Sequence, residues 1–209
     1  MLPPLYLNVS PDDIVLDMCA APGSKTSQIL EMMYGDRRRL SEGCVVANDA
    51  DYSRAQMLIH QLQRSGTAGM VVINHPGQFL PELHGPKNVE KKYRFKYDKI
   101  LCDVPCSGDG ATRKIPLKWA NWHTNDGMAL HTLQLSIVVK AMNLLKPGGS
   151  LVYSTCSLNP IENESVINAL FQKVEKGLEL IDIHPMFEVK GRRGMLSWKV
   201  MTIEYQKTE

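Results

Sequence analysis

Short apolar runs alternate along this chain with segments whose apolar residues follow helical spacing. The runs are Ile14–Met18, Cys44–Asn48, Met70–Asn74, Lys99–Cys102 and Ser150–Tyr153. Their length suits buried strands. Short strands that alternate with helices predict βαβ units, because parallel neighbours need a crossover connection. We therefore expect an α/β fold with a mostly parallel central sheet flanked by helices.

Four segments carry the helical pattern. We expect helices over about Lys25–Met33, from Asp51 to about Gly66, from Gly127 to Leu145 and from Asn159 to about Lys176. Lys146–Gly149 is predicted to stop the third helix, and Asn159 with Glu162 fits the capping box of the fourth. Leu178–Ile183 is expected to form a sixth strand.

The composition is that of one globular domain over residues 1–209, with no clear pattern after about residue 184. Hydrophobic residues make up 44% and charged residues 22%, so the chain can bury a core. A net charge of +2 permits a nucleic-acid partner without arguing for one. The five cysteines include no Cys-x-x-Cys pair, so we expect no zinc site and a reducing, intracellular environment. No apolar run approaches the ~18 residues of a membrane span.

The first apolar run leads into a tight turn, Cys19–Thr26, which consists of small residues with proline and glycine. Such a turn lets a ligand approach the backbone, and the amides of the following helix favour an anion. Its single glycine differs from a dinucleotide site and from a P-loop, so we expect a smaller ligand with an amino-acid tail. Asp17 is placed to face an ammonium group, and Asp49 to accept hydrogen bonds from ribose hydroxyls. These features predict S-adenosylmethionine; the alternative is that both acids only cap turns.

Two further turns deliver cysteines to the carboxyl ends of predicted neighbouring strands, where function collects in open α/β sheets. They are Asp103-Val104-Pro105-Cys106 and Ser154-Thr155-Cys156-Ser157. Carbon 5 of a pyrimidine attacks a methyl sulfonium only after a nucleophile has added at carbon 6, and a thiolate can add there. Because Cys156 precedes a predicted helix N-terminus, we expect its pKa to be lowered. Cys106 would assist breakdown of the adduct, and Asp103 would contact the base.

A long polar loop after Cys106 interleaves basic residues with tryptophans. Its members are Arg113, Lys114, Lys118, Trp119 and Trp122. Such a mixture suits phosphate contacts and base stacking, and long loops in compact domains are often functional. We take Arg113 and Lys114 as candidate RNA-binding residues. The alternative is a lid that is packed by its own tryptophans.

Three stretches together resemble the Sun-domain (Fmu/Sun/Nop) family of RNA cytosine-5 methyltransferases. They are Asp17–Thr26, Asp103–Gly110 and Ser154–Glu164. The resemblance covers roughly Leu5 to Met201 and is greatest to the eukaryotic tRNA cytosine-5 methyltransferases. It implies a class I methyltransferase catalytic domain with a Rossmann-like fold, S-adenosylmethionine as cofactor, and RNA, foremost tRNA, as substrate. It also implies the nucleus or nucleolus as location, with the cytoplasm as alternative. We expect a monomer without a metal or a membrane attachment.

The resemblance also implies a role for each matching residue. Cys156 would be the nucleophile and Cys106 would promote product release, while Asp103 would contact the cytosine and the cofactor methyl region with Lys25 close by. The implied cofactor-binding residues are Cys19, Ala20, Ala21, Pro22, Gly23, Ser24, Lys25, Asp49 and Asp103.

The chain departs from this family in two respects. Close members carry an acid after Asn-His at the end of the third strand, where it contacts adenine, but here Pro76 follows Asn74-His75. We also expect a fragment of a longer protein that lacks the last antiparallel strand of the family sheet. A non-catalytic RNA-binding scaffold is therefore the alternative function. An amino-group methyltransferase is a third, disfavoured because Cys106 stands where those enzymes place an aromatic residue.

Overall fold

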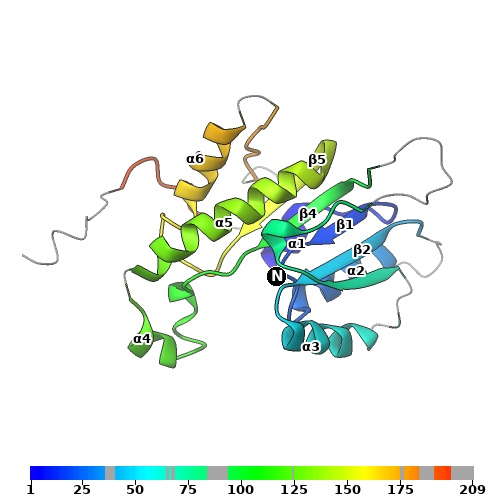
Figure 1. Ribbon diagram of the computed structural model, residues 1–209, viewed down its shortest axis with the longest axis horizontal. Coiled ribbons are helices and arrows are strands. Elements are labelled where there is room, and N and C mark those ends of the chain that lie inside the picture. The colour runs from blue at the N-terminus through cyan, green and yellow to red at the C-terminus, as the bar shows by residue number, and fades with distance from the viewer. Residues whose placement is uncertain are drawn as a thin grey trace, which may run out of the picture.

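Five parallel strands form one sheet in the computed structural model, in the order β3-β2-β1-β4-β5 (Figure 1). They are β1 (Ile14–Asp17), β2 (Cys44–Asp49), β3 (Met70–Asn74), β4 (Tyr97–Asp103) and β5 (Leu145–Ser154). The structure describes residues 1–35, 41–64, 66, 69–83, 94–123, 125–174, 177–183 and 191–198. The predicted α/β fold with a parallel sheet is confirmed, and the chain order reverses between β1 and β4, where such sheets bind ligands.

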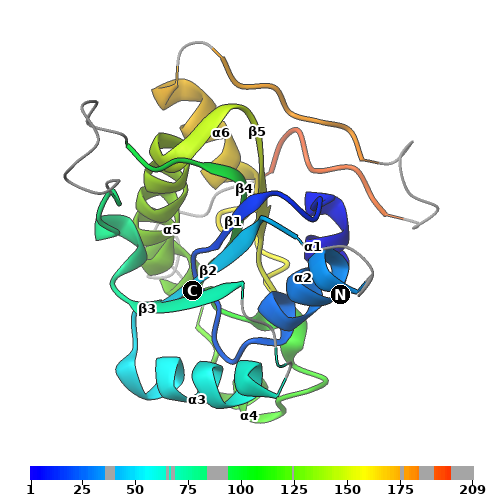
Figure 2. The same cartoon turned by 90° about the vertical axis from the view of Figure 1, so that its right-hand side faces the viewer.

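Helices cover both faces of the sheet. They are α1 (Leu2–Leu7), α2 (Ser24–Tyr34), α3 (Tyr52–Gln63), α4 (Leu117–Asn121), α5 (Asn125–Leu144) and α6 (Glu164–Lys173), with short 3-10 helices η1 (Gly77–Phe79) and η2 (Asp109–Ala111). Figure 2 shows α2 and α5 on opposite sides of the strands. Strand side chains alternate between the faces: Val15 packs with Ile29 of α2, whereas Leu16 packs with Ile137 of α5.

The same alternation directs three acidic side chains toward one face at the carboxyl ends of the strands. Asp17, Asp49 and Asp103 are the last residues of β1, β2 and β4. Each of these acids lies two residues after a side chain of the core on the α2 and α3 side, as Asp17 does after Val15, so it points to the same face. The fold therefore gathers these acids beside the N-terminus of α2, at the edge from which the two cysteine turns leave.

Several predicted boundaries are wrong. Leu178–Ile183 forms no strand, since these residues have no regular hydrogen-bonded structure. Lys146–Gly149 stops the helix, as expected, but already belongs to β5. Helix α6 begins at Glu164, and its N-cap is Asn163 rather than Asn159. Cys156 therefore lies eight residues before the first residue of α6, rather than directly before a helix N-terminus as expected.

No helix in the described parts of the chain is both long enough and apolar enough to span a membrane.

Candidate active site

The turn between β1 and α2 is closed by contacts from the second strand. Asp49 is buried, and its Oδ2 accepts a hydrogen bond from the Ala21 amide at 3.1 Å. The Arg54 guanidinium donates to the Ala21 carbonyl at 2.8 Å and lies 3.4 Å from Asp49 Oδ2. Gly23 holds φ at +108°, which favours glycine, directly before α2. The predicted cofactor turn is thus a fixed backbone cradle with Asp49 at its side.

Buried groups line the inner side of this turn. Asp17 is 1% exposed, and its Oδ2 accepts a hydrogen bond from Thr26 Oγ1 at 2.7 Å. Among the described residues, its Oδ1 has no hydrogen-bond partner although it is buried. Burial raises the pKa of Asp17 to about 7 despite the bond from Thr26. Burial, reinforced by Asp17 and Asp49, also raises the pKa of Cys19 far above its usual range, so Cys19 stays a thiol.

A salt bridge joins the cofactor turn to the first cysteine turn. Lys25 Nζ lies 2.6 Å from Asp103 Oδ2, and both side chains are about a quarter exposed. Ser154 Oγ donates to the other oxygen, Oδ1, at 2.7 Å. Asp103 therefore connects α2, β4 and β5. The resemblance had implied that Lys25 and Asp103 lie close, and they do.

The two cysteines of the predicted site meet at the sheet edge. Cys106 Sγ and Cys156 Sγ are 3.2 Å apart, within hydrogen-bonding distance for sulfur. Cys156 is exposed, whereas Cys106 is partly buried. Burial, with the bond to Cys156, raises the pKa of Cys106 to about 12. Cys106 therefore keeps its proton at neutral pH and can donate a hydrogen bond to Cys156 Sγ. Because Cys156 is the exposed thiol of the pair, its sulfur is the one that a substrate can reach.

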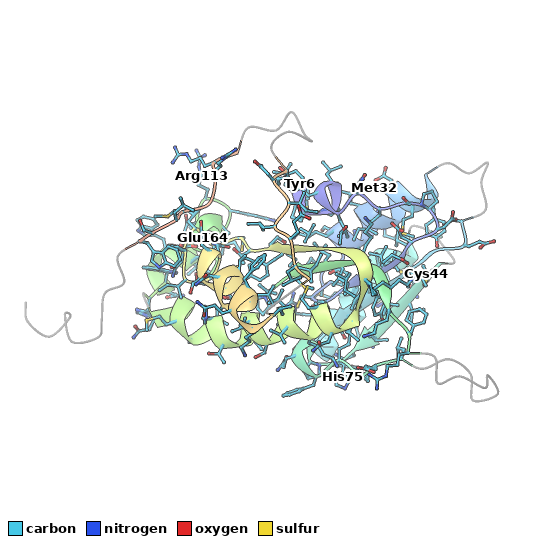
Figure 3. The ribbon with its side chains drawn as sticks, turned by 90° about the horizontal axis from the view of Figure 1, so that it is seen from above. Tyr6, Met32, Cys44, His75, Arg113 and Glu164 are labelled. Carbon is cyan, nitrogen blue, oxygen red and sulfur yellow. The ribbon has the colours of Figure 1, made fainter. Side chains whose placement is uncertain are left out.

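The basic loop lies beside this thiol pair. Lys118 Nζ donates to the Ser107 carbonyl at 2.8 Å and anchors α4 to the first cysteine turn. Arg113 and Lys114 are exposed, and Figure 3 shows Arg113 at the periphery of the molecule. Trp119 is 81% exposed. Trp122, in contrast, is half-buried, and its Nε1 is buried without a hydrogen-bond partner among the described residues. Only the exposure of Trp119 favours an outward-facing surface, while Trp122 fits the packed alternative.

Glu162 has a role that the sequence did not reveal. The pattern suggested a capping-box acid, but α6 starts after it and its carboxylate is fully buried. It contacts Ser107 and Ser157. No local signal indicates this, because Ser107 is 55 residues away in the chain.

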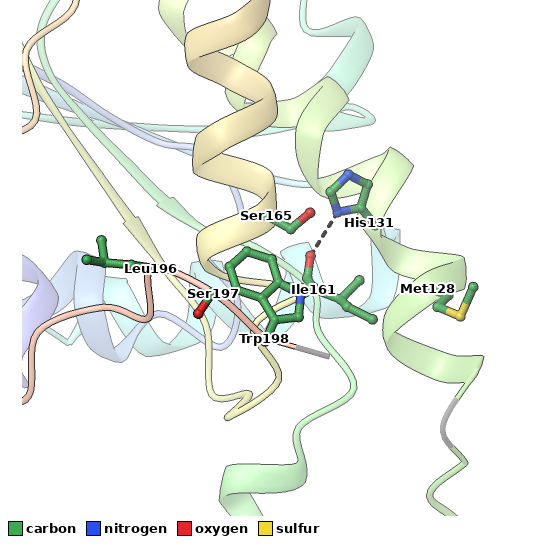
Figure 4. Close-up of a pocket in the computed structure, with 7 residues that line it drawn as sticks. All are labelled: Met128, His131, Ile161, Ser165, Leu196, Ser197 and Trp198. Atoms are coloured by element: carbon green, nitrogen blue, oxygen red, sulfur yellow. Dashed lines mark hydrogen bonds between the residues drawn. The ribbon is translucent and has the colours of Figure 1, made fainter. Parts of the chain in front are cut away.

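A separate pocket opens where α5, the start of α6 and residues 191–198 meet (Figure 4). Its volume is about 520 Å³, and it is lined by Met128, His131, Ile161, Ser165, Leu196, Ser197 and Trp198. His131 Nδ1 and the Ile161 carbonyl are 2.8 Å apart within it. None of the predicted site residues lines this pocket.

Pro76 follows β3 and precedes η1. The neighbouring ends of β2 and β3 are tied through Asn48, whose side chain bonds to the main chain of Met18 and His75. The expected consequence of Pro76 for adenine binding stays a prediction.

Solved structures define the class of protein. A structure titled "The crystal structure of NSun6 from Pyrococcus horikoshii with SFG" matches with TM-score 0.68 and 28% identity, covering 82% of this chain and 40% of its own. A methyltransferase homologue from the same organism matches with TM-score 0.62 and 35% identity, covering 81% and 48%. The chain has the Rossmann-like fold of the class I S-adenosylmethionine-dependent methyltransferases.

Sequence relatives identify the family. The family described as "16S rRNA methyltransferase RsmB/F" matches residues 4–196. The "Multisite-specific tRNA:(cytosine-C(5))-methyltransferase" of Saccharomyces cerevisiae is 51% identical over 203 residues, covering 96% of this chain and 29% of its own. Its counterpart trm4b of Schizosaccharomyces pombe is 45% identical over 221 residues, covering 96% and 32%. The chain therefore belongs to the RsmB/F methyltransferase family, and it spans about a third of the length of these two relatives.

Proposed function

We propose that this chain carries the catalytic machinery of an RNA cytosine-5 methyltransferase that uses S-adenosylmethionine. One observation carries the proposal: two free thiols 3.2 Å apart lie at the carboxyl ends of neighbouring strands, beside an acid paired with a lysine. Methyl transfer to carbon 5 of a pyrimidine needs a thiol nucleophile and a way to release it. The names of the fungal relatives, which specify tRNA and cytosine carbon 5, support tRNA as the substrate.

The groups around the turn fit S-adenosylmethionine. The unpartnered buried oxygen of Asp17 suits the ammonium group of a methionine tail. The backbone of Cys19–Lys25 would surround that tail, and Asp49, which retains free lone pairs, would accept bonds from ribose hydroxyls. When bound, S-adenosylmethionine supplies an electrophilic methyl group.

Cys156 acts as the nucleophile. Its exposed sulfur, as thiolate, adds to carbon 6 of the cytosine, and the electron pair of the ring double bond becomes available at carbon 5. In its ion pair with Lys25, Asp103 is a carboxylate and accepts a hydrogen bond from the exocyclic amino group of the base. These contacts would orient the ring with carbon 5 toward the cofactor's methyl group, whose bond to the sulfonium sulfur would break as the bond to carbon 5 forms.

Cys106 then releases the product. Its thiol passes a proton to the departing sulfur of Cys156 and takes the proton from carbon 5, so that the ring double bond re-forms and the carbon–sulfur bond breaks. The raised pKa of Cys106 keeps this thiol protonated before the reaction, so it holds the proton that the departing sulfur takes up. Cys106 thereby returns to its starting form, and Cys156 leaves as a thiol, which loses the proton released by the reaction to solvent when it becomes a thiolate again.

RNA would lie over the loop that contains α4. Arg113 and Lys114 would contact phosphates, and the exposed Trp119 ring would stack on a base. Residence in the nucleus or nucleolus, and a monomeric state, remain predictions.

Transfer of labelled methyl groups from S-adenosylmethionine to a tRNA transcript tests this proposal. We expect transfer to cytosine carbon 5 by the parent chain and none by Cys156→Ala. Asp49→Asn should weaken S-adenosylmethionine binding in calorimetry, whereas Glu31→Gln, a matched change on the exposed side of α2, should leave it unchanged. RNA binding without any methyl transfer would refute the catalytic role and favour a scaffold.

A further inference from the structure

Each of the two active-site cysteines is followed by a serine, and both serines contact the same carboxylate. Ser107, next to Cys106, donates its backbone amide to Glu162 Oε1 at 2.8 Å and its hydroxyl to Oε2. Ser157, next to Cys156, donates its hydroxyl to Glu162 Oε2 at 2.6 Å. One side chain thus bridges two turns that leave different strands and lie 50 residues apart in the chain.

Glu162 is built to stay in this position as an anion. It is fully buried, and Gln134 of α5 supplies a fourth hydrogen bond to Oε1 at 3.0 Å. Burial opposes its charge, but the bonds from Ser107, Ser157 and Gln134 outweigh burial and lower its pKa. A buried carboxylate with four donors is ionised and geometrically fixed, which matters because leaving any of these groups unpaired is costly.

Two further hydrogen bonds also join the two cysteine turns. The Gly110 amide donates to the Cys156 carbonyl, and the Leu158 amide donates to Asp109 Oδ1. These bonds join Asp109 and Gly110 of the first turn to Cys156 and Leu158 of the second. The hydroxyls of Ser107 and Ser157 also lie 3.4 Å apart, and Glu162 is the charged group that accepts a hydrogen bond from each of them.

We propose that Glu162 is the positioning residue of the active site: it clamps the two cysteine turns together and thereby sets the distance between Cys106 Sγ and Cys156 Sγ. The catalytic meaning of this distance rests on the proposed function, in which Cys106 exchanges protons at the sulfur of Cys156. The clamp itself is a geometric property of the free chain and can be measured without RNA or cofactor.

Disulfide formation measures the clamp directly. Diamide oxidises two neighbouring thiols to a disulfide and takes up both hydrogens, and its rate depends on how often the two sulfurs meet. Misplacement of reacting groups by about 1 Å can cost on the order of 100-fold in rate. We expect Glu162→Ala to slow formation of the Cys106–Cys156 disulfide by about that factor, as followed by peptide mass mapping.

The conservative variant gives a graded result. In Glu162→Gln the amide oxygen can still accept from the Ser107 amide, and the serine hydroxyls can turn to accept from the new amino group. We therefore expect a smaller loss, about tenfold, from weaker neutral bonds. Glu164→Gln is the matched control: this acid begins α6 and bonds to the Met195 amide, so it should crosslink at the parent rate.

Ser157→Ala serves as an independent variant where Glu162→Ala does not fold. It removes one clamp bond while the carboxylate stays, and it should also slow crosslinking. Parent-like crosslinking rates in folded Glu162→Gln and Ser157→Ala chains would overturn the proposal. A failure of methyl transfer in the parent chain would instead refute the proposed function and leave this measurement unaffected.

Kinetics distinguish positioning from general support of the fold. We expect Glu162→Gln to lower kcat for methyl transfer with little change in the KM for RNA or for S-adenosylmethionine, because neither ligand contacts this buried side chain. Losses confined to KM would contradict a positioning role.

Discussion

Replacing Gly23 with alanine tests whether the cofactor turn is fixed by its packing on α3. Gly23 has φ +108°, and an added Cβ would lie 2.9 Å from Leu58 Cδ1 and 3.3 Å from Gln61 Cγ. Leu58 is fully buried, so it cannot move aside without disturbing the core. Gly23→Ala should therefore combine backbone strain with overpacking.

The chain offers a control that separates the two effects. Gly148 also has a positive φ, +78°, but an added Cβ there meets nothing within 4 Å. A left-handed conformation costs a non-glycine residue about 1–2 kcal/mol, and overpacking of a core costs about 1–3 kcal/mol more. We expect Gly148→Ala to lower the free energy of unfolding by about 1–2 kcal/mol and Gly23→Ala to lower it by about 2–5 kcal/mol.

Equilibrium unfolding in urea measures both variants, and calorimetry measures their affinity for S-adenosylmethionine. Gly23→Ala should weaken cofactor binding, because relief of the clash displaces the turn or α3, while Gly148→Ala should bind like the parent chain. Equal losses of stability in the two variants, with unchanged cofactor affinity, would refute the reasoning.

Three further predictions concern charge. The pKa of Glu162 is lower in the folded chain than in the unfolded chain, so its ionisation stabilises the fold at any pH above the ordinary carboxyl pKa. This stabilisation is lost as pH falls through the folded pKa. Below about pH 4.5, Tm should therefore fall more steeply in the parent chain than in Glu162→Gln. The pKa of Asp17 is about 7, so binding of an ammonium group beside it should make the Asp17 carboxyl release its proton at about pH 6.5. Calorimetry in buffers of different ionisation enthalpy should detect this proton release in the parent chain and not in Asp17→Asn. Replacing both Arg113 and Lys114 with alanine should lower the slope of log K for RNA binding against log salt by about 1–1.5, and an unchanged slope would exclude them as phosphate contacts.

The order of strands and helices is predictable from the sequence because burial on both faces leaves apolar runs of strand length. The meeting of Cys106 and Cys156 follows as well, since neighbouring parallel strands end at the same edge. Their partners are harder to predict. The Lys25–Asp103 pair spans 78 residues, and only the packing of α2 on the sheet brings it together.

Local rules failed where a tertiary contact was stronger. Asn159, Pro160 and Glu162 have the pattern of a helix start, yet the buried serines draw Glu162 inward, and the helix begins only at Glu164. Leu178–Ile183 alternates like a strand but pairs with no strand in the described part of the chain, and Leu180 and Ile181 are exposed. Periodicity in the sequence indicates which residues prefer burial. It does not indicate whether an edge strand of the sheet is available for the segment to pair with.

Trapping of a covalent complex with RNA tests the central claim most directly. The account predicts that Cys106→Ala, incubated with S-adenosylmethionine and tRNA, accumulates an adduct that survives denaturing electrophoresis, because the nucleophile adds but is not released. The double variant Cys106→Ala with Cys156→Ala should form no adduct. An adduct that persists without Cys156, or that never forms while methyl transfer proceeds, would contradict the assigned roles of the two thiols.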